Sequence, residues 1–284
     1  MDDLQRIRDL YGEPRLDPAA KVRVRERLAA EPRRVIRWRL SWTVAVTCLA
    51  ASVLAVVFTL PSQGGLSGRS ILLAAASTAA SDPTAGGAYW HIRKLRPGTG
   101  VTELWVAGDG RAWRGQGAPG EPLTVTRVTG RAPFSMAGRD LTLEQILRLP
   151  SDSGALRAWV AGTLPANSGG GVMADALSGL LWSKPSPPGV RAAAYRLLAD
   201  LPDVRYLGGR TDQRGRPGEA FAFTPAPGVR RTLIIDPVSS QVLSCADTGP
   251  DGTTERLELV LDAGWTDTAP PTPTRHRPPA PRTP

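Results

Sequence analysis

The chain has 284 residues, a formal net charge of +9 and 41% hydrophobic residues, a composition that suits one sizeable domain with appendages. The charge is uneven, since residues 1–41 carry a surplus of four positive charges and residues 270–284 a surplus of three, which leaves two between them. A surplus of two is too small for a phosphate-binding face across a whole domain, so we expect no direct binding of nucleic acid.

Residues 1–41 form a basic segment with the pattern of two short helices. The second is expected to start at the Asp-Pro pair 17–18, an N-cap followed by proline in the first helical position. Its apolar residues, Val22, Val24 and Leu28, make a stripe too thin for a core of their own. We interpret them as candidate partner-binding residues. The alternatives are contact of the basic side chains with anionic lipid and a plain stop-transfer charge cluster.

Residues 42–60 (WTVAVTCLAASVLAVVFTL) are an uncharged apolar run long enough to cross a hydrocarbon core of about 30 Å. Four arginines precede the run closely and no charge follows it at once, which predicts a cytoplasmic N-terminus. The alternatives are a cleaved signal peptide, which usually has a shorter apolar stretch, and a buried core helix. The sequence therefore predicts a single-pass protein of the cell membrane, with its C-terminal part extracytoplasmic.

Beyond the span, residues 61–69 predict a flexible linker and residues 70–268 one extracytoplasmic domain. Helical spacing is expected in 71–80, 141–147, 153–164, 172–182 and 190–201. Strands are expected in 89–93, 102–106, 111–114, 123–128, 204–207, 220–224, 230–236, 241–244 and 255–262. Strands on both sides of a helical block favour the α+β class, with one mainly antiparallel sheet. Residues 269–284 are proline-rich and predict a disordered tail.

Few residues in the sequence suit metal or redox chemistry. The histidines are His91 and His276, and the cysteines are Cys48 and Cys245, so neither spacing of a zinc site is present. Cys48 lies in the predicted span and cannot pair with Cys245 in one chain, and we expect Cys245 to pack as a small apolar residue at a strand end. We expect no metal and no cofactor.

Gly115, Gly117 and Gly120 match the dinucleotide pattern GxGxxG, but Glu121-Pro122 follows where that site needs a helix. His91 is the one histidine of the domain that a catalytic triad could use. It lies in a predicted strand, where a structural histidine is the simpler interpretation. We therefore expect no enzymatic activity.

Three tryptophans, Trp90, Trp105 and Trp113, fall in consecutive predicted strands. If they line one face of the sheet, they form either a helix-covered core or an apolar ligand groove. We treat them as the candidate groove residues.

Several segments together resemble a known family. They are DPAAKVRVRERL before the span, LTLEQILRLPSD, ALRAWVAGTL, PPGVRAAAYRLLADLPDVRYLGGRTDQRGRPG and RTLIIDPVSSQVLS. The chain resembles, over nearly all of residues 1–265, an actinobacterial family of single-pass membrane proteins, without assigned catalytic residues, that accompany extracytoplasmic-function sigma factors. Its outer domain is similar in element order to the curved antiparallel sheet with covering helices of the lipoprotein-carrier and periplasmic sigma-regulator group. This second similarity licenses no function by itself.

Two functions follow as hypotheses. In the first, the outer domain senses an envelope ligand or partner while the N-terminal helices engage a cytoplasmic regulator, with a sigma factor as the first candidate. Residues 1–41 lack histidine and cysteine, so such a contact would differ from that of zinc-binding anti-sigma domains. In the second, the domain is an anchored envelope protein that binds a lipid or the acyl chain of a lipoprotein.

Overall fold

The computed structural model describes residues 67–83 and 86–272, which belong to the compact unit Gly64–Pro284. The predicted cytoplasmic segment, the predicted membrane span and residues 273–284 of the predicted tail lie outside this part of the chain. Within it, no helix combines the length and the hydropathy needed to cross a membrane.

The domain is built on one nine-stranded sheet in the order β4-β3-β2-β1-β11-β10-β9-β8-β7, antiparallel at every pairing. Its strands are β1 Tyr89–Arg96, β2 Gly100–Ala107, β3 Ala112–Gly117, β4 Thr124–Arg127, β7 Arg205–Thr211, β8 Pro217–Ala226, β9 Val229–Asp236, β10 Gln241–Thr248 and β11 Thr254–Thr266. A separate hairpin pairs β5 Phe134–Met136 with β6 Arg139–Leu141. The helices are α4 Gly68–Ser81, α5 Leu143–Leu147, α6 Ser153–Ala161, α7 Gly170–Trp182 and α8 Pro188–Asp200.

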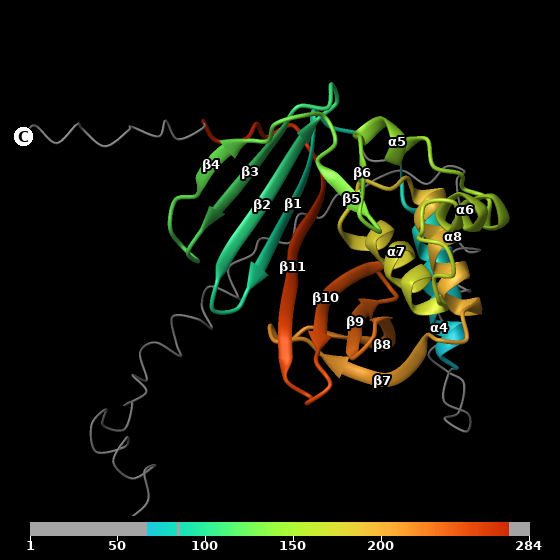
Figure 1. Ribbon diagram of the computed structural model, residues 1–284. Coiled ribbons are helices and arrows are strands. Elements are labelled where there is room, and N and C mark those ends of the chain that lie inside the picture. Colours follow the sequence, from blue (N-terminus) through green and yellow to red (C-terminus); the bar gives the residue numbers. More distant parts are fainter. Residues whose placement is uncertain (1–66, 84–85, 273–284) are drawn as a thin grey trace, which may run out of the picture. The chain divides into compact units, whose positions relative to one another are not determined.

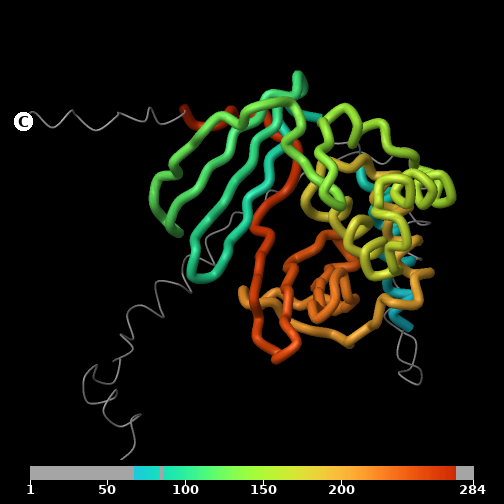
Figure 2. Tube along the Cα trace, viewed as in Figure 1, coloured from blue at the N-terminus to red at the C-terminus, as the bar shows by residue number. Residues whose placement is uncertain are grey.

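The last strand, β11, joins two halves of the sheet that are distant in sequence. One half is the meander β1 to β4, and the other is the meander β7 to β10. β11 pairs with β1 along one edge, with Trp90 opposite Trp265, and with β10 along the other, with Ser244 opposite Leu259. Figure 2 shows this strand in red between the green half and the orange half.

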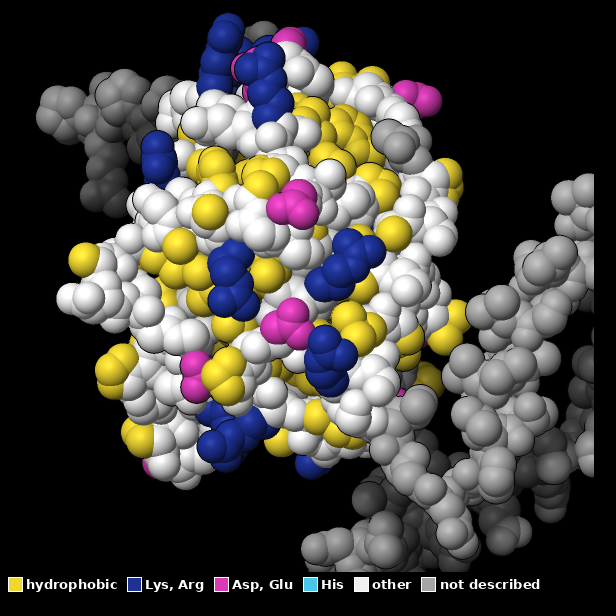
Figure 3. Space-filling model, turned by 90° about the vertical axis from the view of Figure 1, so that its right-hand side faces the viewer, with side chains coloured by type: hydrophobic (Ala, Val, Ile, Leu, Met, Phe, Trp, Pro, Cys, Tyr) yellow, Lys and Arg dark blue, Asp and Glu magenta, His cyan; other side chains and the backbone are white. Residues whose placement is uncertain are grey.

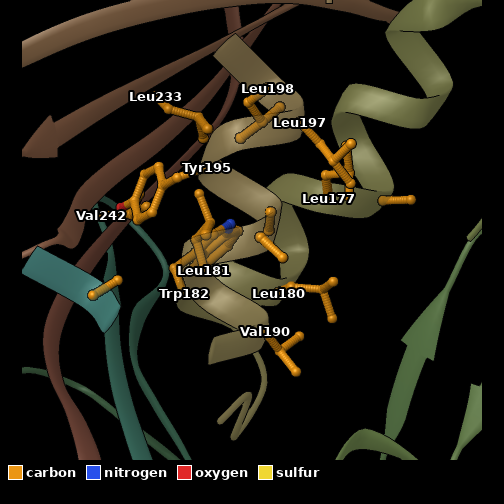
Figure 4. Packing of buried hydrophobic residues seen from close by; sticks show 14 of the residues in the cluster. Leu177, Leu180, Leu181, Trp182, Val190, Tyr195, Leu197, Leu198, Leu233 and Val242 are labelled. Atoms are coloured by element: carbon orange, nitrogen blue, oxygen red, sulfur yellow. The ribbon is translucent and has the colours of Figure 1, made fainter. Parts of the chain in front are cut away.

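The helices cover the inner face of the curved sheet, mainly over β7 to β10, while β1 to β4 extend away from them (Figure 1). α4 packs along α8 and buries Ile71, Leu72 and Ala75. α8 is amphipathic, and its Tyr195 is fully buried and points toward Val242 (Figure 4). The Tyr195 hydroxyl donates a 2.9 Å hydrogen bond to the carbonyl of Ser240 in the β9–β10 turn, which fixes α8 to the sheet.

The opposite side of the helical layer is ordinary protein surface. On the face that Figure 3 shows, Lys and Arg side chains alternate with Asp and Glu and with small apolar patches. A cluster of charged side chains lies between the sheet and α7, as described below.

The predicted α+β class and the antiparallel sheet with covering helices are confirmed, and each predicted helix and strand of the domain is present. The first helix starts earlier than expected, at Gly68, and β10 continues to Thr248, so Cys245 lies buried inside a strand and not at its end. The β5–β6 hairpin was not predicted. Its strands are three residues long, too short for an alternating pattern, and Ala137 and Gly138 turn between them with positive φ.

The N-terminus of α7 gives a stability prediction, because this helix meets the backbone of β8 at Gly171. A Cβ atom there would lie 1.9 Å from the carbonyl oxygen of Thr224, whereas a Cβ at Gly169 would meet nothing within 4 Å. Gly171→Ala should therefore lower the free energy of unfolding by about 2–3 kcal/mol, since backbone must move. Gly169→Ala should cost less than about 1 kcal/mol. Urea unfolding followed by tryptophan fluorescence measures both, and equal losses would contradict the predicted close packing.

Candidate functional site

A cavity of about 680 Å³ opens between the inner face of the sheet, α7 and the β5–β6 hairpin. One wall is formed by β1, β2 and β3, where the sheet extends away from the helices, and the opposite wall by α7 and the residues that follow it. The hairpin closes one side with Phe134 and Met136. The volume is in the usual range for small-molecule sites, about 300–1,000 Å³.

Six cationic side chains line this cavity, which we call the cationic cavity: Lys94, Arg96, Arg114, Lys184, Arg231 and Arg256. The alternation of β1 explains two of them, because Lys94 and Arg96 continue the row of Trp90 and Ile92 on the inner face. That row begins in the hydrophobic core and ends in the cavity. The inner face of β1 is thus apolar at one end and charged at the other.

Glu258, on β11, is the central carboxylate of the cluster and is fully buried. It accepts hydrogen bonds from Lys94, at 3.2 Å, and from Arg96, and it pairs with Arg256 at 3.0 Å. Burial alone would raise its pKa, but Lys94, Arg256 and Arg96 outweigh that effect and lower the pKa to about 2. Glu258 therefore stays ionised and holds three cations at one point of the wall.

A second pairing lies beside the first. Arg231 donates from Nε and Nη2 to the two carboxylate oxygens of Asp247, at 2.6 Å and 2.7 Å, and also contacts Asp175 of α7. The register explains this arrangement, since Asp247 lies opposite Arg231 on β9 and Arg256 on β11. This forked geometry ties the helix α7 to the sheet at the rim of the cavity.

Lys184, two residues after the end of α7, is 9% exposed, and its Nζ donates a 3.3 Å hydrogen bond to Ser183 Oγ. A Cβ atom at Gly179 would lie 2.8 Å from this Nζ, so the glycine leaves the room that the ammonium occupies. Within the described part of the chain, no carboxylate lies within 4 Å of it. Burial lowers the pKa of Lys184 to about 8, against the opposing effect of Asp175.

The three candidate groove residues do not line one face of the sheet, because Trp90 lies on the face opposite to that of Trp105 and Trp113. Trp90 lies opposite Val106 and packs in the core against Phe134, with ring centroids 5.5 Å apart. Trp105 and Trp113 lie opposite each other on the outer face. Strand alternation places neighbours such as Val106 and Trp105 on opposite faces, and the pairing register of β1 with β2 decides which of them joins Trp90.

Trp105 is 4% exposed on the outer face because Leu123 and His91 cover it. His91 stacks on the Trp105 ring at 4.8 Å and shares a 2.8 Å hydrogen bond with Glu103. Gly115 provides the space, since a Cβ there would meet Trp105 and Leu123 at 3.1 Å. The glycine pattern therefore serves packing on the outer face, and β3 ends at Gly117 without a following helix.

Sequence reasoning placed no site residue in the cationic cavity, and its candidate partner-binding residues, Val22, Val24 and Leu28, lie outside the described residues. A usable signal existed in β1, where Lys94 and Arg96 follow Trp90 and Ile92 with a period of two. In residues 67–83 and 86–272, no group of three or more His, Cys, Asp and Glu side chains could hold a metal ion.

Solved structures similar to the chain include MucB in complex with MucA(peri), at 18% identity and a TM-score of 0.29, over 69% of this chain and 55% of that chain. The MucA/MucB complex of Pseudomonas aeruginosa is similar at 14% identity and a TM-score of 0.32, over 70% of this chain and 58% of that chain. The chain thus spans little more than half the length of these structures, and the scores carry no assignment of function. No family model and no curated protein matches the chain.

The buried carboxylate gives a prediction on stability. Glu258→Gln should lower the free energy of unfolding at neutral pH by about 3 kcal/mol, because it leaves three cations without their shared partner. Glu255→Gln, an exposed position on the same strand, should change it by less than about 0.5 kcal/mol.

The same carboxylate predicts a dependence on pH. Its folded-state pKa of about 2 is below the ordinary 4.5, so its contribution is complete above pH 4.5 and is lost as the pH falls toward 2. The difference in unfolding free energy between the wild type and Glu258→Gln should therefore shrink in that interval. Urea titrations at a series of pH values measure it, and a constant difference would show that the ion pairs of Glu258 do not stabilise the fold.

Proposed function

We propose that the protein is a membrane-anchored extracytoplasmic sensor or regulator without catalytic activity. The outer domain binds an envelope ligand or partner in the cationic cavity, and residues 1–41 engage a cytoplasmic regulator, with a sigma factor as the first candidate. The observation that carries the proposal is a ligand-sized cavity that contains a buried ammonium group, Lys184, without a carboxylate partner among the described residues.

Binding is the role that best suits the lining of the cavity. Its charged groups converge from β1, β3, β9, β11 and the end of α7. Glu258 and Asp247 hold the cations of β1, β9 and β11 in defined positions. Convergent, preorganised polar groups in a cavity are typical of ligand sites. Four of its six cations are arginines, which keep their protons at any physiological pH and so bind charge without exchanging protons.

The alternative, an anchored protein that binds a lipid or lipoprotein acyl chain, fits the lining less well. Phe134, Met136 and Trp182 supply apolar contact, but the same cavity exposes six cations. An acyl chain that filled the cavity would remove these charges from water without offering hydrogen bonds or opposite charges, and this desolvation is costly. The sensor proposal requires no such desolvation, because a polar or charged ligand replaces the water.

The proposed role of residues 1–41 predicts that mutation of their apolar stripe abolishes binding of the cytoplasmic partner. Replacing Val22, Val24 and Leu28 together with Asp should abolish recovery of a cytoplasmic partner in a crosslinking pull-down of full-length protein from its native membrane. The reason is that three charges on the apolar stripe cannot be buried in a protein interface.

A charge control separates protein docking from lipid attraction. Replacing Lys21, Arg23 and Arg25 with Gln keeps the apolar stripe and removes charges that an anionic membrane would attract, so the partner should still be recovered. If the Asp variant recovers the same proteins as the wild type, residues 1–41 only fix the topology, and the anchored lipid-binding protein becomes the better description.

A further inference from the structure

The charges around the cationic cavity do not balance. Six cations line it, and the carboxylates that pair with them on the inner face are Asp175, Asp247 and Glu258. Glu103 also lines the cavity, but its carboxylate pairs with His91 and Arg93, which lie on the outer face. The cavity therefore holds about three more positive charges than negative ones, in a domain whose total surplus is small.

The excess is located on identifiable groups. Lys184 is buried at the end of α7, and a buried ammonium without a carboxylate is costly unless an anion accompanies it. Arg114 of β3 lines the facing wall with Gln116, and among the described residues it has no ion pair and no side-chain hydrogen bond. These two cations stand outside the network of Glu258 and Asp247, so they are free to bind a ligand.

An apolar surface adjoins the charged one. Phe134 and Met136 of the hairpin and Trp182 of α7 line the same cavity, and Lys94 lies over the Trp182 ring at 4.9 Å from its centroid. A ligand that fits both surfaces has an anionic group and an apolar part.

We propose that the cationic cavity binds a phosphate monoester, with the phosphate held by Lys184 and Arg114 and the apolar part against Phe134, Met136 and Trp182. This rests on the proposed function, in which the cavity is the ligand site, and it names the chemistry of that ligand. The phosphate is either that of a lipid headgroup or that of a soluble compound.

The size of the charge excess favours phosphate over carboxylate. A phosphate monoester carries about −1.5 to −2 charges near neutral pH and three acceptor oxygens, whereas a carboxylate carries one charge and two oxygens. An excess of about three charges is matched more closely by the phosphate. Guanidinium and ammonium groups are also the usual protein ligands of phosphate oxygens.

The test uses full-length protein in nanodiscs of phosphatidylcholine, titrated by calorimetry with phenyl phosphate, benzoate and phenol. These probes share a ring and differ in charge. Phenyl phosphate should bind saturably, benzoate more weakly, and phenol not measurably. Lys184→Met and Arg114→Gln should each weaken binding of phenyl phosphate about tenfold or more, the loss expected for one charge-assisted hydrogen bond.

Arg157→Gln is the matched control, because it removes the same charge from an exposed position on α6 outside the cavity, and its affinity should equal that of the wild type. Lys184→Met should melt at or above the wild-type temperature, since it removes a buried cation. If that variant fails to fold, Arg114→Gln still decides, because Arg114 is exposed.

Titration with dihexanoyl phosphatidic acid, with dihexanoyl phosphatidylcholine as its control, shows whether the phosphate belongs to a lipid headgroup or to a soluble compound. Saturable binding of the phosphatidic acid alone assigns the phosphate to a lipid headgroup, and binding of phenyl phosphate as well assigns it to phosphate monoesters in general. Absence of binding by both, or equal affinities in wild type, Lys184→Met and Arg114→Gln, overturns the proposal. The pull-down with the variants of Val22, Val24 and Leu28 does not depend on these binding results. Failure of the phosphate proposal and failure of the regulator function are therefore distinguishable.

Discussion

The pairing of β11 with both β1 and β10 is the constraint on which the rest of the domain depends. Two antiparallel meanders that are distant in the sequence become one sheet only through this strand. Glu258 strengthens the join, because its buried carboxylate on β11 binds Lys94 and Arg96 from the neighbouring strand β1. The cations of the cavity would repel one another without it, so the carboxylate that stabilises the sheet also makes the charged wall possible.

The position of the cavity follows from the uneven covering of the sheet. α4, α7 and α8 pack over the half that ends in β7, and the half that ends in β4 extends beyond them (Figure 1). Along the inner face of β1 the residues change from Trp90 and Ile92 to Lys94 and Arg96. Trp90 packs against Phe134 of the hairpin, and Lys94 and Arg96 lie where the cavity opens beside Trp182 of α7. A ligand there would contact both the sheet and α7.

The sequence predicted the elements well and the site poorly, for physical reasons. α8 and the hairpin of β2 and β3 have local patterns, helical spacing and a Gly-Asp-Gly turn, which depend on neighbours in the chain. The cavity depends on register between distant strands, since Arg114, Arg231 and Arg256 meet only when the sheet forms. The net charge of the domain did not indicate the cavity either, because acidic residues elsewhere in the domain offset the cations of the cavity. Register likewise separated Trp90 from Trp105.

The proposed coupling between the cationic cavity and residues 1–41 is tested most simply by removing the two free cations and measuring how much of the proposed cytoplasmic partner is recovered. The full-length double variant Lys184→Met/Arg114→Gln keeps the N-terminal segment intact. If the protein is a sensor, the amount of cytoplasmic partner crosslinked to it in the native membrane should differ from that of the wild type by several-fold, with Arg157→Gln unchanged. Equal recovery by all three proteins would contradict a regulatory role for the cavity.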